Sequence, residues 1–165
     1  MDTRLLDRQS KVKNNIKLLY TNCNGIKNKI TELQVAAELY DFQILCVAET
    51  HISHDVLDAE IRLYNYNVFR NDRDQWGGGS AIYIHKSITC SLVTSFNAPD
   101  SIAVLFNHKQ LNIIIVCVYR SQALSYDENC KILDQIEKLK VNYDQEILVV
   151  GDFKIYRLCA GDQDW

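Results

Sequence analysis

The sequence predicts an α/β fold in which two amphipathic helices cover mixed β-sheets. Helical spacing of apolar residues is confined to two segments, whereas about seven short runs rich in β-branched and aromatic residues have the length of strands. Several of those runs follow one another with only a turn between them, which indicates a mixed sheet rather than a strict alternation of strands and crossover helices. The 165 residues are 47% hydrophobic and 24% charged, which is typical of one soluble globular domain.

The first half of the chain is expected to contain one helix and four strands. The helix is predicted at residues 29–40, where Ile30, Leu33 and Ala37 recur at helical spacing. Strands are predicted at residues 16–21, 43–48, 64–70 and 80–85.

The second half is expected to contain the second helix and the most apolar strands. Strands are predicted at residues 87–95, 101–107, 111–119 and 147–150, with the only proline, Pro99, marking a loop between the first two. The run at 147–150 ends at Gly151 and is typical of a strand buried on both faces. The helix is predicted at residues 126–141, from four apolar residues at helical spacing: Ile132, Leu133, Ile136 and Leu139.

Three consecutive glycines, residues 77–79, precede the strand at 80–85 and make up half of the chain's six glycines. A phosphate-binding loop is only weakly indicated, because no Lys-Ser/Thr pair follows them. A flexible hairpin turn or a bulge is the favoured interpretation.

Charge and cysteine usage bear on the environment of the protein. Residues 1–17 carry five Lys/Arg and two Asp, a local charge of +3, which leaves −6 for the rest of a chain whose net charge is −3. A basic arm can contact phosphates, although a solvated tail is favoured. The six cysteines form no Cys-x-x-Cys pair, so we expect reduced thiols in an intracellular compartment. No run reaches the ~18 apolar residues of a membrane span, and no signal-peptide core is present at the N-terminus.

Polar residues follow four of the apolar strands. Asn22 and Asn24 follow the first strand, and Glu49 follows the second. Tyr119 and Asp152 stand at the ends of two later strands. Ligand sites in open α/β sheets lie beyond the carboxyl ends of strands, so these side chains converge if their strands are neighbours.

This set of residues suits the hydrolysis of a phosphodiester. Paired carboxylates can hold a hard cation such as Mg²⁺ and orient or deprotonate water, while amide and phenol groups bind phosphate oxygens. The competing interpretation, that each acid merely caps a turn, is equally favoured for the pair. His51 and His54 beside Glu49 are weak evidence for zinc, because two loop histidines at that spacing do not make a zinc motif.

Four segments, TNCNGIKNKITEL, ILCVAETH, GGGSAIYI and ILVVGDF, occur in an order and at spacings that resemble the endonuclease/exonuclease/phosphatase superfamily. Within that superfamily the chain looks most like the apurinic-type endonuclease domain of non-LTR retrotransposons. The resemblance runs from about Ile16 to Phe153. It implies a four-layer α/β sandwich of the DNase I-like type, incomplete at the C-terminus, and Mg²⁺-dependent nicking of DNA that leaves a 3′ hydroxyl for reverse transcription.

The resemblance also implies a role for each matched residue. Glu49 would be the principal metal ligand, and Asp152 would align or activate the attacking water. Asn22 would contact the active-site phosphate or water. Tyr119 would contact the scissile phosphate, and Asn24 would occupy the adjoining polar position.

The sequence departs from the family pattern in two places. Lys154 stands where the family has the asparagine of Gly-Asp-x-Asn, so a neutral amide is replaced by an ammonium group. The terminal Ser-Asp-His segment of the family is also absent, since the last histidine is His108. We therefore expect a partial domain over residues 16–165, preceded by a basic lead-in at 1–15, with impaired or no endonuclease activity.

Two alternatives remain open at this stage. The chain is a non-catalytic remnant that binds nucleic acid, or it is a phosphatase or phosphodiesterase of the same superfamily with another substrate. Action on DNA predicts a nuclear location, although no targeting signal is evident in the sequence.

Overall fold

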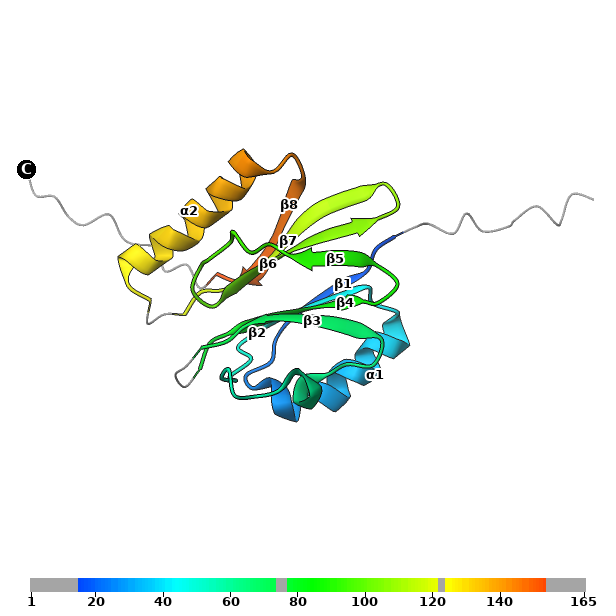
Figure 1. Ribbon diagram of the computed structural model, residues 1–165. Helices are drawn as coiled ribbons and strands as arrows, with labels where there is room; N and C mark the ends of the chain where they lie inside the picture. The colour runs from blue at the N-terminus through cyan, green and yellow to red at the C-terminus, as the bar shows by residue number, and fades with distance from the viewer. Residues whose placement is uncertain (1–14, 74–76, 122–123, 154–165) are drawn as a thin grey trace, which may run out of the picture.

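The computed structural model describes residues 15–73, 77–121 and 124–153, which form two stacked β-sheets with one α-helix on each outer face (Figure 1). The order of the layers is helix α1, first sheet, second sheet, helix α2, which confirms the predicted four-layer α/β sandwich. Residues 1–14 of the predicted lead-in (1–15) and the tail from Lys154 onward lie outside the described residues. No helix among the described residues is long and apolar enough to cross a membrane.

Each sheet has four strands, one parallel pair and two antiparallel pairings. The parallel pairs are β1 with β2 in the first sheet and β7 with β8 in the second. In spatial order the first sheet consists of β1 (Leu18–Asn22), β2 (Ile44–Ala48), β4 (Ser80–His85) and β3 (Tyr66–Asn71). The second consists of β5 (Thr89–Leu92), β6 (Ser101–His108), β7 (Leu111–Tyr119) and β8 (Glu146–Asp152).

The two predicted helices form close to their expected bounds, as α1 (Ile30–Tyr40) and α2 (Tyr126–Asn142). Helix α2 begins at a capping box, in which the Ser125 hydroxyl accepts the backbone N–H of Glu128 and the Glu128 carboxylate accepts that of Ser125. Two short 3₁₀ helices, η1 (Ile26–Asn28) and η2 (Asp58–Ile61), were not predicted, because three or four residues are too few to show a periodic pattern.

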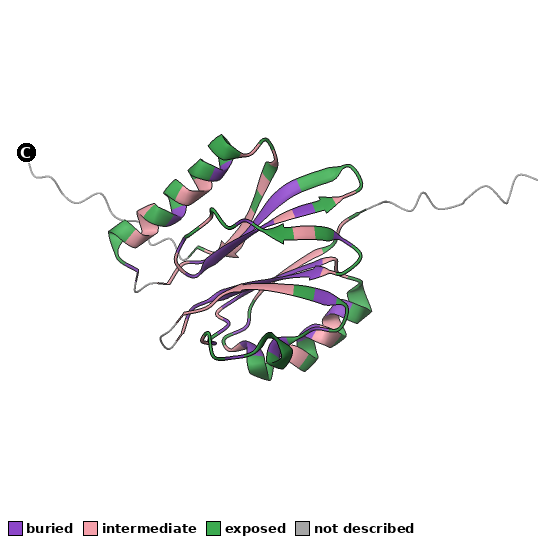
Figure 2. Ribbon diagram, viewed as in Figure 1, coloured by how far each residue is buried: buried purple, intermediate pink, exposed green. Residues whose placement is uncertain are grey.

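Three apolar layers hold the sandwich together. Leu33 and Ala37 of α1 pack against the outer face of the first sheet, and Ile132 and Leu139 of α2 pack against the outer face of the second. The third layer fills the space between the sheets and includes the fully buried Phe106. Figure 2 shows the buried residues concentrated on the strands and on the inner faces of the helices.

The predicted burial of residues 147–150 on both faces is wrong. These residues belong to β8, which is the edge strand of the second sheet, and Leu148 is 40% exposed. An apolar run specifies a strand but not its place in a sheet, and an edge strand has a neighbour on one side only. The β1 strand is likewise an edge strand, and it is half-buried along most of its length.

Candidate functional site at the strand ends

The parallel pairs bring the carboxyl ends of four strands to one end of the sandwich. Asn22, the last residue of β1, pairs with Ala48, the last residue of β2, so Glu49 follows directly beside it. In the second sheet Tyr119, the last residue of β7, pairs with Asp152, the last residue of β8. Each sheet therefore delivers an acid and a second polar residue at the end of a parallel pair.

A hydrogen bond joins the two sheets at this end. The side-chain amide of Asn22 donates from Nδ2 to Oδ2 of Asp152 over 3.2 Å, across 130 residues of sequence. The carbonyl of the same Asn22 side chain, Oδ1, accepts the backbone N–H of Asn24 at 3.2 Å. Asn24 has a φ of 44°, a left-handed conformation that asparagine tolerates better than most residues. The Asn-x-Asn motif thus forms a local turn that orients the amide toward Asp152.

Glu49 is held by the turn that follows β1. Its backbone carbonyl accepts the N–H of Gly25 at 2.8 Å and the thiol of Cys23 at 3.2 Å. Its carboxylate, with the side chain 13% exposed, has Oε2 3.7 Å from Nε2 of His51. The φ of Glu49 is 54°, an unfavourable conformation for a glutamate that persists only where surrounding contacts enforce it.

Tyr119 and Asp152 are fixed by the β7–β8 ladder. The backbone N–H of Arg120, just beyond β7, donates to the carbonyl of Asp152 at 3.0 Å. The Arg120 guanidinium donates to the carbonyl of Phe153 at 3.3 Å and to Oδ1 of Asn129 in α2. Tyr119 is buried, with 8% of its surface exposed. Helix α2 therefore supports the strand that carries Asp152.

Tyr20 is a further polar residue at the site that the sequence did not single out. It precedes Asn22 by two positions on β1, so both side chains project from the same face of the strand. Its hydroxyl is buried and has no hydrogen-bond partner among the described residues. Burial raises the pKa of the Tyr20 phenol, and the nearby Cys117, Asp152 and Glu49 raise it further. The phenol therefore stays protonated and has a donor to offer a bound water or ligand.

The donor set fits a hard divalent cation. The two carboxylates and the amide oxygen supply oxygen ligands only, and Mg²⁺ characteristically takes one or two carboxylates and completes its shell with water and substrate oxygens. The unpartnered hydroxyl of Tyr20 beside the acids is consistent with a site that receives a hydrated group. Among the described residues no group of three or more His, Cys, Asp or Glu side chains is placed to hold a metal, so water and substrate oxygens would have to complete the shell of a bound cation.

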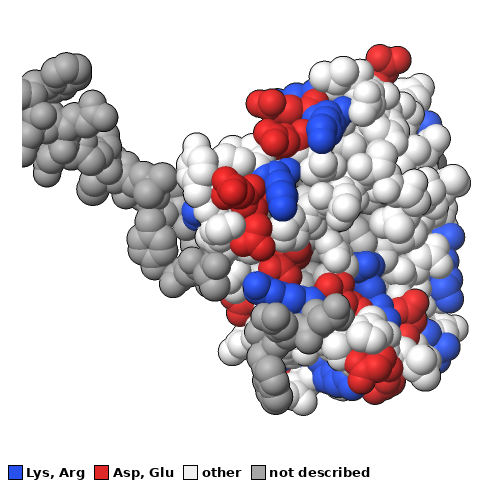
Figure 3. All heavy atoms as spheres, turned by 60° about the vertical axis from the view of Figure 1, so that its left-hand side comes forward, with Lys and Arg blue, Asp and Glu red and all other residues white. Residues whose placement is uncertain are grey.

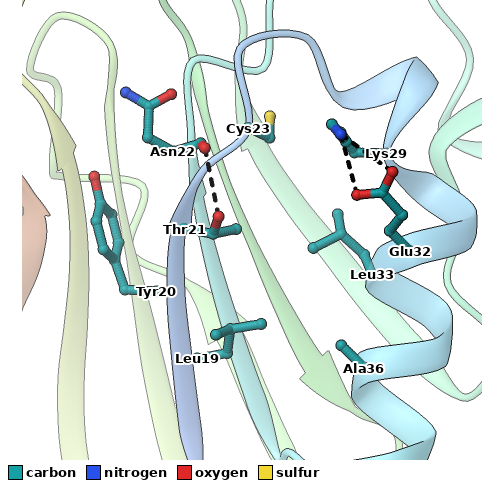
Figure 4. A pocket seen from close by; sticks show the side chains of 9 residues that line it. All are labelled: Leu19, Tyr20, Thr21, Asn22, Cys23, Lys29, Glu32, Leu33 and Ala36. Atoms are coloured by element: carbon teal, nitrogen blue, oxygen red, sulfur yellow. Dashed lines mark hydrogen bonds and ion pairs between the residues drawn. The ribbon is translucent and has the colours of Figure 1, made fainter.

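A pocket beside β1 borders this convergence of side chains. It has a volume of about 390 Å³ and lies between β1 and α1, and its lining includes Tyr20 and Asn22 as well as Leu19, Thr21 and Leu33. Figure 4 shows Tyr20 and Asn22 projecting from β1 on the side away from α1. These two side chains therefore lie on the inter-sheet side of β1, where Asn22 joins Asn24, Glu49, Tyr119 and Asp152 in what we call the strand-end site, and both residues also border the pocket.

The structure also gives the glycine triplet a place at the site. The antiparallel β3–β4 pairing makes the triplet part of a hairpin connection, as the sequence predicts. In addition, the backbone N–H groups of Thr50 and His51 donate to the carbonyls of Gly79 (3.4 Å) and Gly78 (3.0 Å). Tyr20 lies two residues before Asn22 on the predicted strand, and this spacing could have been used to place its side chain at the site. Nothing in the sequence indicates the contact between the glycine triplet and residues 50–51. Lys154 lies outside the described residues.

Solved structures share this fold. The chain superposes on the endonuclease domain of TRAS1, a telomere-specific non-LTR retrotransposon, with a TM-score of 0.63 and 13% identity over 84% of this chain and 58% of that one. It superposes on the AP endonuclease LMAP from Leishmania major with a TM-score of 0.65 and 12% identity, covering 83% of this chain and 54% of that one. A mannosyl-6-phosphatase from Bacteroides thetaiotaomicron gives 0.61 and 13%, with coverage of 86% and 66%.

At these identities the likeness establishes the fold, and the chain spans less than two thirds of each of the three structures. No curated protein matches the chain in sequence. Residues 19–153, which include the whole strand-end site, match the model of the Endonuclease/Exonuclease/phosphatase family. The chain therefore belongs to the endonuclease/exonuclease/phosphatase family.

Proposed function

We propose that this chain is a magnesium-dependent phosphodiester hydrolase of the DNA endonuclease type, with turnover impaired by Lys154. The observation that carries the proposal is the hydrogen bond between Asn22 and Asp152. It brings the end of the first sheet, with Glu49 beside it, against the end of the second. A substrate phosphate at this position would meet an acid from each sheet.

Asp152 is proposed to align the attacking water and to accept its proton. The amide of Asn22 donates to Oδ2 of Asp152 and thereby fixes the orientation of the carboxylate before substrate arrives. A base that is already oriented needs no reorganisation during the reaction, which is the main source of its advantage over a base in solution.

The substrate phosphate is proposed to lie against Asn22, Asn24 and Tyr119. Amide and phenol groups are neutral donors, so they can stabilise the charge that develops on phosphate oxygens without neutralising the adjacent acids. Tyr119 and Asp152 are paired in the β7–β8 register, so a phosphate that contacts Tyr119 also lies near the proposed base.

Glu49 is proposed to be the principal ligand for Mg²⁺, and the negative charge of Asp152 would also attract the cation. Bound there, Mg²⁺ would polarise the phosphoryl group as a Lewis acid. The hydrogen bonds that the Glu49 carbonyl accepts from the backbone N–H of Gly25 and from the thiol of Cys23 hold the Glu49 backbone in place independently of any ligand.

Lys154 is proposed to impair this site. It follows Asp152 by two residues, at the position where the family pattern has a neutral amide. An ammonium group ~4 Å from a divalent cation would be repelled by roughly 8 kcal/mol at an effective dielectric constant of about 20, twice the unit-charge value. That figure is an upper bound, since a lysine side chain can turn toward solvent.

DNA is proposed as the substrate because the neighbouring structures include the endonuclease domain of a retrotransposon and AP endonucleases. In the view of Figure 3 acidic and basic side chains are interspersed, and the described atoms on that face form no continuous basic patch. The surface in that view therefore offers no broad electrostatic attraction for DNA, and binding would depend on the strand-end site and its cation.

The proposal is tested by incubating the purified chain with supercoiled plasmid in Mg²⁺ or in EDTA. We expect slow nicking by the wild type, faster nicking by Lys154→Asn, and none by Lys154→Asn combined with Glu49→Ala. Lys138→Asn, which removes an exposed lysine from α2, is the matched control and should behave as the wild type. Absence of Mg²⁺-dependent nicking in Lys154→Asn would refute the proposed reaction.

The same samples separate the alternatives. Release of inorganic phosphate from a phosphomonoester, without nicking, would favour a phosphatase of the same family. Retention on DNA that ignores Mg²⁺ and weakens steeply with salt would favour a non-catalytic binding module.

A further inference from the structure

Asp100 is a buried carboxylate that belongs to neither the strand-end set nor the sequence motifs. It immediately precedes β6, and its side chain is 3% exposed. Oδ1 accepts the backbone N–H of Gly79 at 2.9 Å, and Oδ2 lies 3.4 Å from Nη1 of Arg73. Both carboxylate oxygens are thus engaged, one by the glycine triplet and one by a cation that compensates the buried charge.

The glycine triplet connects Asp100 to the backbone next to Glu49. Gly79 and Gly78 accept hydrogen bonds from the backbone N–H groups of Thr50 and His51, the two residues that follow Glu49. Because Glu49 is held at a φ of 54°, the backbone on both of its sides must be fixed. The turn after β1 fixes one side, and the glycines anchored on Asp100 fix the other.

Asp100 also contacts Tyr119, which the second sheet contributes to the site. Its backbone carbonyl accepts the N–H of Tyr119 at 3.1 Å. A single residue therefore touches, through its side chain and its main chain, the segments that carry Glu49 and Tyr119.

These close approaches explain why glycines occupy this position. A Cβ on Gly78 would lie 2.7 Å from Oδ1 of Asp100, and a Cβ on Gly79 would lie 2.4 Å from Oγ1 of Thr50. Both residues also have positive φ, at 78° and 81°. Only glycine lets the loop lie between Asp100 and Thr50 without strain.

We propose that Asp100 is a positioning residue for the strand-end site. Its carboxylate anchors the glycine triplet, which holds the backbone after Glu49, and its backbone carbonyl anchors the N–H of Tyr119. The effect on cation binding rests on the proposed function, whereas the effect on the backbone of residues 49–51 does not.

The test compares Asp100→Ala and Asp100→Asn, each in the Lys154→Asn background, by amide hydrogen exchange and by Mn²⁺ titration followed by electron paramagnetic resonance. In Asp100→Ala we expect exchange at Gly79, Thr50 and His51 to accelerate at least about tenfold, and Mn²⁺ affinity to fall about 10- to 100-fold, as for other residues that orient a ligand. Asp100→Asn keeps an acceptor for Gly79, so it should recover most of the protection and most of the affinity.

Tyr83→Phe is the matched control, because it also removes one buried hydrogen bond, from the Tyr83 hydroxyl to the carbonyl of Ile61 at 2.8 Å. It should leave both measurements unchanged. Failure of the Lys154→Asn parent to bind Mn²⁺ would contradict the proposed function alone, and hydrogen exchange would still decide the role of Asp100. Unchanged exchange at Thr50 and His51 in Asp100→Ala would overturn the proposal. If Asp100→Ala does not fold, Asp100→Asn decides the question. Amide exchange in Asp100→Asn that accelerates as much at Ile82, in the middle of β4, as at Thr50 would overturn the proposal too.

Discussion

Gly151→Ala is predicted to displace the end of β8 and with it Asp152. A Cβ on Gly151 would lie 2.0 Å from the backbone oxygen of Val118 and 2.9 Å from its carbonyl carbon, in the neighbouring strand β7. Ordinary contact begins near 3.4 Å, so the two strands would have to separate by about 1.4 Å (3.4 minus 2.0) at this point. The obstacle is backbone, which cannot turn aside as a flexible side chain can. The glycine of Gly-Asp-Phe is therefore required by the close approach of two strands, immediately before the proposed base.

The expected cost in stability is about 3 kcal/mol, the upper part of the range for inserting a methyl group into a packed position. For a chain of this size that corresponds to a fall in the melting temperature of roughly 6–12 °C. A displacement of about 1 Å at the reacting groups can cost roughly 100-fold in rate, so the loss of activity should exceed the loss of folded protein.

Urea unfolding measures the first effect, and plasmid nicking in the Lys154→Asn background at a temperature where the variant is fully folded measures the second. Ile132→Ala, which shortens a buried side chain of α2 and costs a comparable 2–5 kcal/mol, is the control and should leave nicking unchanged. A Gly151→Ala protein with wild-type stability and wild-type nicking would refute the role given to the close approach.

Further predictions concern the thiol of Cys23, the cap of α2 and the core. Burial raises the pKa of Cys23 to about 11 from an ordinary value of 9.0. At pH 9, alkylation of Cys23 by iodoacetamide, followed by mass spectrometry, should therefore be much slower in the folded protein than in protein unfolded in urea; equal rates would contradict the burial. Because the folded pKa is the higher one, the stability that this thiol contributes is complete below about pH 9 and is lost as the pH rises toward 11, so Cys23→Ala should flatten that decline in urea unfolding. Ser125→Ala should cost about 1 kcal/mol through the lost cap, with no change at the strand-end site; an unchanged urea midpoint would contradict this. Phe106→Ala should cost about 3–5 kcal/mol, because the ring is fully buried between the sheets; a loss below 1 kcal/mol would show that the two sheets do not enclose it.

The sequence was sufficient for the elements, because they depend on local patterns, whereas the four-layer arrangement was expected from the family resemblance. The alternation and apolarity of Ser80–His85 and Leu111–Tyr119 specify strands whose bounds the structure reproduces. The helices follow from the spacing of a few apolar residues, such as Leu33 with Ala37 and Ile132 with Leu139. The place of a strand within a sheet depends on distant partners, which is why the apolar run in β8 was assigned to an interior position that the structure does not give it.

The site shows the same division between local and distant information. The polar residues at the strand ends are visible in the sequence because each follows an apolar run. That Asn22 reaches Asp152 over 130 residues, and that Asp100 joins the glycine loop to the Glu49 turn, depends on the stacking of the two sheets. A lone acid after Pro99 carries no pattern, so the position of Asp100 could not have been inferred.

The claim that the two sheets share one cation site is tested most directly by titrating the isotope-labelled Lys154→Asn protein with Mn²⁺ and recording paramagnetic line broadening of each backbone amide. We expect the amides around Glu49 and those around Asp152 to broaden together, at one apparent affinity, and both effects to disappear in Glu49→Gln. Broadening confined to one of the two strand ends, or unchanged in Glu49→Gln, would contradict the shared site.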